Sequence, residues 1–335
     1  MKRPIILQTP GIRIRAEGDA LVIPEGTKLR RILFRNIQYI VISRGISLSS
    51  DVLFKAATND VFVFIADFDG EITGVYYPAG FSGNILLQRE QVKAYYDERG
   101  VHLAKIWASA SIETKARLLR YLGENRKGTG IGKELIEISN EIMEYLRDIE
   151  KLEGDIDTIR KDLMIAEAYA GEKYFSALAK IIPPKYGFTG VRTRRPPRDM
   201  ANATISYANS IVREKILYYV LISGLNPFFG FLHADRPKRK SLVLDISEEF
   251  IVPVSHLAAI TLMVRKKLRE TDFVRVGEGI YLDYGGRIKV RYQIETILQR
   301  KIRGKTINKI ILNQIQNLVE HLKNQKTYKP ATIDF

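Results

Sequence analysis

The sequence contains no cysteine among its 335 residues. Without thiols the chain can form neither disulfide bonds nor thiolate metal sites, so any metal ion must be held by oxygen and imidazole ligands. Long apolar runs are also missing, because no segment approaches the roughly 20 residues that a transmembrane helix needs. The basic start, Met1 to Gln8, is followed by no apolar region long enough for a signal peptide. We therefore expect a cytoplasmic protein with no membrane partner.

Three well-known catalytic motifs are absent as well. The chain has no phosphate-binding Walker loop, no Gly-x-Gly-x-x-Gly after a strand and no Gly-x-Ser-x-Gly elbow. The glycine-rich residues 128–133 have the wrong spacing for either glycine-loop motif, and we interpret them as a loop between two helices.

Acidic residues are in deficit: 38 Asp and Glu face 53 Lys and Arg, which gives a formal net charge of +15. Such an excess favours a polyanionic partner, with nucleic acid ahead of an anionic membrane surface. Because the chain is 45% hydrophobic and 27% charged, it can bury a full core. Its length suits about two domains of ~150 residues each.

The pattern of apolar residues changes near residue 88. Residues 1–87 carry short β-branched and aromatic runs separated by turn signals, whereas residues 88–335 show mostly helical spacing. We predict an α+β protein: a small N-terminal β domain (1–87) followed by a larger, mostly α-helical domain (88–335). Within the second domain, residues 279–283 and 287–291 flank Gly285-Gly286 and predict a hairpin. The last ten residues are expected to be loose or to dock late in folding.

Three separated segments supply candidate metal ligands. Glu167 lies in a predicted helix with small neighbours, and His233 ends an apolar run. Asp245 and Glu248 are three residues apart, so both project from one face of a helical turn. The alternatives are an exposed glutamate, a buried structural histidine and an acidic first helical turn. Together, one imidazole and several carboxylates in a basic chain predict a divalent metal acting on phosphodiesters, with the ligands converging on one cation-sized site.

Two basic segments are candidates for phosphate contacts. The first is stiffened by prolines and contains Arg192, Arg194, Arg195 and Arg198. The second lies between His233 and Asp245, so it must be near any site they build, and it contains Lys238, Arg239 and Lys240. The alternative for the arginine segment is a solvated linker between helices.

These segments together resemble one family, the CRISPR-associated spacer-acquisition integrases, or Cas1 proteins. Residues 45–51 and 62–70 look like the start of that family. The central resemblance is in Arg-Arg-Pro-Pro-Arg-Asp-Met-Ala-Asn-Ala at 194–203 and Gly-Leu-Asn-Pro-Phe-Phe-Gly-Phe-Leu-His at 224–233, followed by Ser-Leu-Val-Leu-Asp-Ile-Ser-Glu-Glu-Phe at 241–250. The similarity spans essentially the whole chain, and three motifs in order are far more specific than one.

The resemblance implies a site and a cofactor. The family's metal ligands carry over onto Glu167, His233 and Glu248, where many members have Asp at the last position. Asp245 is then either a second ligand or a support, and the bulky Lys238–Lys240 stretch differs from the expected glycine-containing linker. Oxygen ligands with one imidazole suit Mg²⁺ or Mn²⁺ better than zinc.

The resemblance also implies an activity in antiviral defence. The family inserts short foreign DNA fragments into a CRISPR array by 3′-hydroxyl attack on a phosphodiester, and cuts branched DNA with water as the nucleophile. Its members form homodimers that assemble on Cas2 through the N-terminal domain, in a heterohexamer-type complex on double-stranded and branched DNA. Two other interpretations stay open: a structure-specific repair nuclease, and a non-catalytic basic scaffold for DNA ends.

Overall fold

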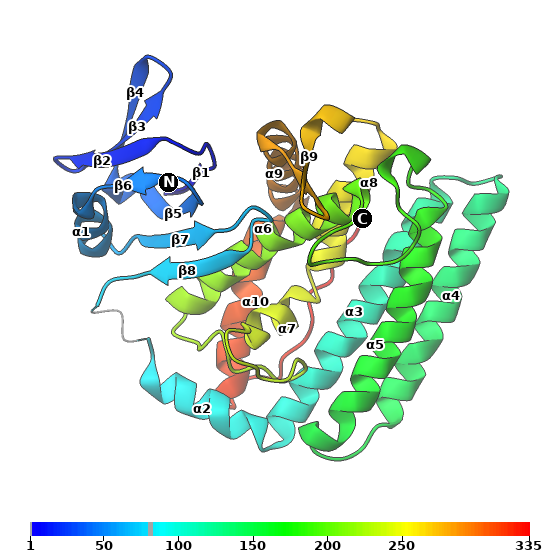
Figure 1. Ribbon diagram of the computed structural model, residues 1–335. Coiled ribbons are helices and arrows are strands. Elements are labelled where there is room, and N and C mark those ends of the chain that lie inside the picture. The colour runs from blue at the N-terminus through cyan, green and yellow to red at the C-terminus, as the bar shows by residue number, and fades with distance from the viewer. Residues whose placement is uncertain (1, 80–82) are drawn as a thin grey trace. The chain divides into compact units, whose positions relative to one another are not determined.

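The computed structural model describes residues 2–79 and 83–335. The chain divides into two compact units, Met1–Ser82 and Gly83–Phe335. The first is built mainly from strands and the second mainly from helices, which confirms the predicted α+β class (Figure 1). The domain boundary expected after residue 87 falls inside α2 (Ile85–Tyr95), just beyond this division.

The N-terminal unit contains two four-stranded sheets. One has the strand order β1 (Arg3–Leu7), β5 (Ile37–Ser43), β7 (Phe62–Ala66) and β8 (Ile72–Tyr76). The other has the order β4 (Lys28–Leu33), β3 (Ala20–Glu25), β2 (Arg13–Glu17) and β6 (Ser47–Leu48). The strands β1, β5 and β7 are parallel, and β8 closes the first sheet antiparallel.

A single apolar core takes side chains from both sheets of this unit. Ile40 and Val63 come from the first sheet, and Ile14 and Leu21 from the second. The helix α1 (Ser50–Thr58) adds Val52 and Ala56 to the same core. Burial of these β-branched and aliphatic groups, at about 25 cal/mol per Å² of apolar surface, is the main force that holds the unit together.

Three long helices lie side by side in the second unit: α3 (Glu98–Glu124), α4 (Gly130–Lys151) and α5 (Ile156–Ala179) (Figure 1). The residue before each helix caps it, since Asp97, Thr129 and Asp155 each accept a hydrogen bond from a backbone N–H of the first turn. The α3–α4 connection needs Gly132, because a Cβ there would lie 2.3 Å from the Arg126 carbonyl oxygen.

The remaining helices complete the second unit. They are α6 (Met200–Ile222), α7 (Ser241–Ser247), α8 (Leu257–Val264), α9 (Tyr284–Leu298) and α10 (Ile307–Leu322). A π-helical turn, Ile251–His256, connects α7 to α8. Short 3₁₀ turns lie at Phe34–Asn36 in the first unit and at Pro184–Tyr186 and Glu270–Asp272 in the second. Two small hairpins pair β9 (Phe273–Val276) with β10 (Gly279–Leu282), and β11 (Lys301–Ile302) with β12 (Lys305–Thr306).

The hairpin expected around Gly285-Gly286 is wrong in its second strand. Residues 287–291 lie in α9, and β10 pairs instead with the preceding β9. The physical reason is the cap of α9: the Asp283 side chain accepts a hydrogen bond of 2.6 Å from the Gly286 N–H. Gly286 is required for close packing, since a Cβ there would lie 2.5 Å from the Asp272 carbonyl oxygen.

Of the two alternatives for the last ten residues, the structure agrees with docking and not with a loose end. Tyr328 is only 1% exposed and Ile333 only 4% exposed, so the segment after α10 is packed into the second unit. Its apolar side chains lack a periodic pattern, and their burial depends on contacts with residues far back in the chain.

In the part of the chain that the structure describes, no single helix is both long and apolar enough to cross a membrane. The segments Ser241–Ser247 and Ile251–Val264 meet the length and composition criteria only as a pair bent by 65°.

Candidate functional site

Helix α3 presents a line of three polar groups. Trp107, Ser111 and Lys115 follow one another at four-residue spacing, which places them on one side of the helix. All three are buried. The helix therefore offers an indole N–H, a hydroxyl and an ammonium group in sequence along one buried face.

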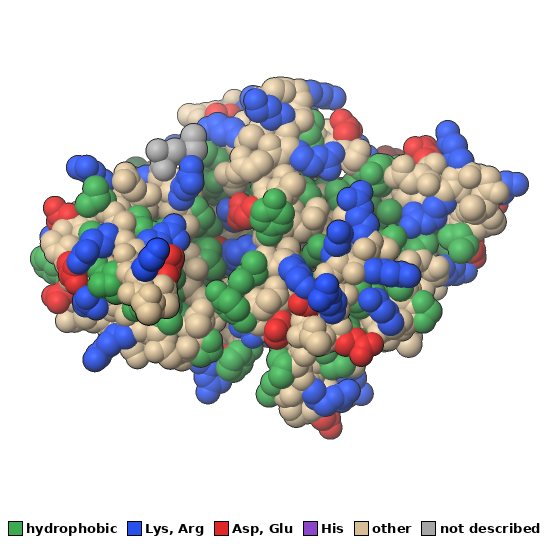
Figure 2. Space-filling model, turned by 90° about the horizontal axis from the view of Figure 1, so that it is seen from above, with side chains coloured by type: hydrophobic (Ala, Val, Ile, Leu, Met, Phe, Trp, Pro, Cys, Tyr) green, Lys and Arg blue, Asp and Glu red, His purple; other side chains and the backbone are tan. Residues whose placement is uncertain are grey.

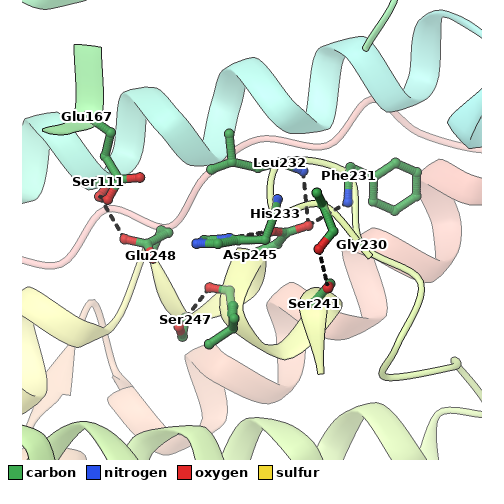
Figure 3. A network of polar contacts seen from close by, with 12 residues as sticks. Ser111, Glu167, Gly230, Phe231, Leu232, His233, Ser241, Asp245, Ser247 and Glu248 are labelled. Atoms are coloured by element: carbon green, nitrogen blue, oxygen red, sulfur yellow. Dashed lines mark hydrogen bonds and ion pairs between the residues drawn. The ribbon is translucent and has the colours of Figure 1, made fainter. Parts of the chain in front are cut away.

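Two carboxylates from different parts of the chain meet at the hydroxyl. Ser111 Oγ lies 3.1 Å from Oε1 of Glu167, which α5 carries, and 2.7 Å from Oε2 of Glu248, which directly follows α7 (Figure 3). Lys115 Nζ donates to Ser111 Oγ at 2.6 Å and to Glu167 Oε1 at 3.4 Å. Glu167 and Glu248, which Ser111 connects and Lys115 adjoins, are called the carboxylate pair below.

The hydroxyl of Ser111 has only one hydrogen to donate. It accepts from Lys115 and lies within donating distance of both carboxylates, so Glu167 and Glu248 share this one donor. Burial, and then the negative charge of Glu167, raise the pKa of Glu248.

The pKa of Glu167 shifts in the opposite direction. Burial would raise this pKa, but the charges of Lys115 and His233 lower it. Hydrogen bonds from Ser111 and Lys115 act in the same direction, and the pKa of Glu167 lies below its ordinary value. When two carboxylates lie this close, the pKa of one is raised and the pKa of the other is lowered.

Asp245 fixes the position of His233. Its Oδ1 accepts from the His233 backbone N–H at 2.9 Å and lies 2.8 Å from Nδ1 of the same residue. Its Oδ2 accepts from the backbone N–H groups of Phe231 and Leu232, at 2.6 and 3.1 Å. Both oxygens of this fully buried carboxylate are thus used. Asp245 has the geometry of a residue that orients a histidine, and not that of an additional ligand.

The imidazole of His233 is directed by this contact. With Nδ1 donating to Asp245, Nε2 is the nitrogen left for another partner. In Figure 3 the ring extends toward Glu248, with Glu167 beyond it. Burial would lower the pKa of His233, but the hydrogen bond and charge of Asp245, together with both glutamates, raise it.

The loop that carries His233 is held by close packing and by backbone hydrogen bonds. A Cβ at Gly230 would lie 2.5 Å from the Cβ of Ser241, so only glycine lets the loop approach the start of α7. On its other side, Gln91 Nε2 donates to the carbonyl oxygens of Asn226 and Phe229, both at 2.9 Å. Gly230 and Gln91 therefore shape the loop.

The three predicted ligands are neighbours, but they do not yet enclose one position. Across residues 2–79 and 83–335, no three His, Cys, Asp or Glu side chains are arranged so that they could hold a metal ion together. The reason is local: Ser111 and Lys115 already bind the carboxylate oxygens of Glu167 and Glu248. Two carboxylates and one imidazole nitrogen are donors that suit Mg²⁺ or Mn²⁺, so the chemistry of the donor set fits such an ion.

The two predicted basic segments come together beside Glu248 through a residue that the sequence did not single out. Arg213 of α6 has its pKa lowered to about 10 by burial and by the nearby charges of Arg194, Arg195 and Arg239, while Glu248 acts against the shift. Among the described residues, its Nε is a buried nitrogen without a hydrogen-bond partner. The four residues Arg194, Arg195, Arg213 and Arg239 are called the arginine cluster below.

The predicted DNA-contact residues differ in how available they are. Arg192 is engaged internally: it donates to Asn202 and, at 3.3 Å, to Ser206, and its guanidinium lies 5.4 Å from the ring centre of Phe175. Its contacts order the segment. By contrast, the exposed members are Arg194, Arg195, Arg198 and Lys238, whereas Arg239 and Lys240 are partly buried.

Basic side chains outnumber acidic ones in the chain, 53 to 38. Figure 2 shows a face on which Lys and Arg side chains are widely spread, while Asp and Glu form small patches. Such a surface attracts the phosphate backbone of nucleic acid.

Ser111, Lys115 and Arg213 were missed by the sequence analysis. The first two share a helical spacing with Trp107, but such spacing is common in buried helices and does not by itself indicate a site. Their importance depends on contacts with residues more than fifty positions away.

Comparison with known protein sequences gives a family-level match. The sequence model for "CRISPR associated protein Cas1" matches residues 5–296. The CRISPR-associated endonuclease Cas1 1 of Archaeoglobus fulgidus is 29% identical over 330 residues, covering 93% of this chain and 94% of that protein.

Solved structures give a similar result for the fold. A Cas1 protein from Thermotoga maritima aligns with a TM-score of 0.83 at 21% identity, over 98% of this chain and all of that one. A casposase bound to an integration product has the same TM-score at 22% identity, over 100% of this chain and 96% of the casposase. A Cas6-RT-Cas1–Cas2 complex has a TM-score of 0.85 at 18% identity, covering 98% of this chain and 36% of that chain.

The support that Asp245 gives to His233 can be tested without metal or DNA. Asp245→Asn replaces one acceptor oxygen with an amide that faces backbone donors, which should lower the free energy of unfolding by about 1–3 kcal/mol. The matched control is Asp235→Asn, because Asp235 is exposed and accepts one bond, from the Gly230 N–H at 3.0 Å. Urea unfolding followed by circular dichroism measures both, and equal effects would contradict the assignment.

Proposed function

The chain belongs to the family of CRISPR-associated Cas1 proteins, and from this premise we propose that it is a metal-dependent DNA integrase of spacer acquisition. In this proposal it joins short foreign DNA fragments into a CRISPR array, and it can also act as an endonuclease on branched DNA. The observation that carries the proposal is the carboxylate pair beside His233, bordered by the arginine cluster.

The residues that would hold the metal are Glu167, His233 and Glu248. Asp245 keeps the Nδ1 of His233 occupied, so Nε2 is the donor nitrogen. When bound, Mg²⁺ or Mn²⁺ would lower the pKa of the attacking hydroxyl and stabilise charge on the phosphoryl oxygens. Lys115 remains beside Glu167 and balances part of the negative charge of the two glutamates.

The basic side chains hold the DNA backbone. Arg194, Arg195 and Arg198 contact phosphates from the proline-rich segment, and Lys238 to Lys240 do so from the loop before α7. Arg213 lies deeper, beside Glu248, where a phosphate would relieve the mutual repulsion of the arginine cluster. The 3′-hydroxyl of the fragment attacks a phosphodiester, and one phosphodiester replaces another. Because bond number and type are conserved, the reaction needs no ATP, in agreement with the missing Walker loop.

The N-terminal unit is assigned to assembly. It carries exposed apolar side chains, among them Phe54, Ile65, Phe68 and Tyr77, which suit contact with another protein. We propose that two copies dimerise through this unit and that the dimers assemble with Cas2 into a heterohexamer-type complex on double-stranded or branched DNA. A complex named for Cas1 and Cas2 shares the fold, which supports this assignment. The cytoplasmic location expected from the sequence stays a prediction.

Two other functions have some support. The printed name of the relative from Archaeoglobus fulgidus, an endonuclease, favours a nuclease that uses water on branched DNA. The side-chain arrangement favours a non-catalytic scaffold for DNA ends, since Lys115 and Ser111 satisfy the glutamates without a metal. Observing metal-dependent strand transfer would exclude the scaffold. Observing a 3′-hydroxyl as the nucleophile would exclude a purely hydrolytic enzyme.

The first test concerns His233. His233→Ala should reduce Mn²⁺-dependent joining of a labelled DNA fragment by more than the ~10–100-fold that loss of a ligand's hydrogen-bond partner costs. DNA affinity should stay nearly constant, because phosphate contacts dominate it. Strand-transfer gels and fluorescence anisotropy measure the two quantities, with Asp235→Asn as control. A parallel collapse of DNA binding would identify a structural histidine.

The second test concerns the arginine cluster. Replacing Arg194 and Arg195 with Ala should weaken DNA binding irrespective of sequence and reduce the slope of log K against log salt by about 1 per lost phosphate contact. The control removes the same charge at Arg300 and Lys301, next to the β11–β12 hairpin. Binding isotherms at several salt concentrations give the slopes. An unchanged slope in the first double variant would assign these arginines to a solvated surface.

The third test concerns the dimer. At micromolar concentration the full chain should have about twice its monomer mass of 38.3 kDa in multi-angle light scattering. A monomeric mass under these conditions would refute the proposed role of the N-terminal unit.

A further inference from the structure

The segment after α10, residues 326–335, folds back along helix α3. Its red trace runs beside α3 in Figure 1. Arg117 of α3 forms an ion pair of 2.8 Å with Asp334, and the rings of Tyr121 and Phe335 stack with centres 5.8 Å apart. We call residues 326–335 the C-terminal strap.

The strap is anchored on a buried carboxylate. Glu249 is 1% exposed, and its Oε1 accepts from Trp107 Nε1 at 3.0 Å and from the hydroxyl of Tyr328. Its Oε2 accepts from Gln314 Nε2 at 2.9 Å and from the backbone N–H of Ala331 at 2.7 Å. Two of the four donors belong to the strap. A carboxylate that is buried without such donors costs several kcal/mol, so the strap and Glu249 depend on each other.

This anchor adjoins the carboxylate pair in two ways. Glu249 directly follows Glu248, so whatever fixes one residue fixes the backbone from which the other extends. In addition, Trp107 and Ser111 are four residues apart on α3, and they bond to Glu249 and Glu248 respectively. Two adjacent glutamates are therefore matched to two adjacent positions on one helix face.

We propose that the C-terminal strap, acting through Glu249, positions Glu248 for metal binding. Tyr328 and Glu249 are then positioning residues, since neither contacts the proposed metal or substrate. The inference rests on the proposed function, because it takes Glu248 as a metal ligand. It assigns to the strap a role in the site beyond that of covering apolar surface.

Metal affinity separates positioning from simple stabilisation. Binding of Mn²⁺ to the full chain is measured by the electron paramagnetic resonance signal of free Mn²⁺, alongside helical circular dichroism. A variant ending at Gln325 lacks the strap, and Tyr328→Phe removes one donor to Glu249 while keeping the ring. The matched control ends at Ile333, which removes the Arg117 ion pair and the Tyr121 stack but keeps all donors to Glu249.

We expect the Kd for Mn²⁺ to rise about tenfold or more without the strap, within the ~10–100-fold range known for supporting residues of metal sites. Tyr328→Phe should raise it less, and the control ending at Ile333 should leave it unchanged. Trp107, the sole tryptophan of the chain, should shift its emission in the strap deletion as its contact with Glu249 is disturbed.

The inference is overturned if Tyr328→Phe and a folded strap deletion both bind Mn²⁺ as the full chain does, or if the full chain binds none. Should the strap deletion not fold, Tyr328→Phe decides, and an unchanged Kd for that variant overturns the inference. Full-length protein that binds Mn²⁺ in a strap-dependent way but joins no DNA would refute the proposed function while still supporting the inference.

Discussion

The structure of the site depends on how two partly buried carboxylates, those of Glu167 and Glu248, are stabilised side by side. Glu167 and Glu248 share one hydroxyl, that of Ser111, and one neighbouring ammonium, that of Lys115. Like charges this close cannot both be ionised without a cation between them. In the present arrangement Ser111 and Lys115 offset part of this repulsion, and a divalent ion bound by both glutamates would offset more of it. The same pair of residues therefore suits a resting state and a metal-bound state.

Helix α3 connects the parts of this site. Its buried face bonds to α5 through Glu167, to the turn after α7 through Glu248, and to the C-terminal strap through Glu249. Each partner comes from a different region of the sequence, so the site exists only when the second unit is fully packed. Asp245 connects α7 to the loop that carries His233, because three backbone N–H groups of that loop donate to its carboxylate.

The sequence was informative wherever function is carried by a local pattern. Glu167, His233 and Glu248 lie in compact motifs, and the change from strand to helix periodicity near residue 88 predicted the fold class. The sequence did not predict roles that depend on distant contacts. Lys115 and Arg213 lie in no distinctive motif of their own helices, and the strap has no periodic pattern. At Gly285-Gly286 two local signals competed, and the cap supplied by Asp283 decided in favour of a helix.

The anchoring of Glu249 has a consequence for the order in which the site is made during protein synthesis. A ribosome releases Glu248 and Glu249 well before Tyr328 and Ala331, the strap donors on which Glu249 depends. Until those residues emerge, the Glu249 carboxylate lacks half of its donors and favours water over the interior. A nascent or interrupted chain thus carries every proposed metal ligand without the support that sets the last of them. The support of Glu249 would in this way be completed only after Tyr328 and Ala331 have been synthesised.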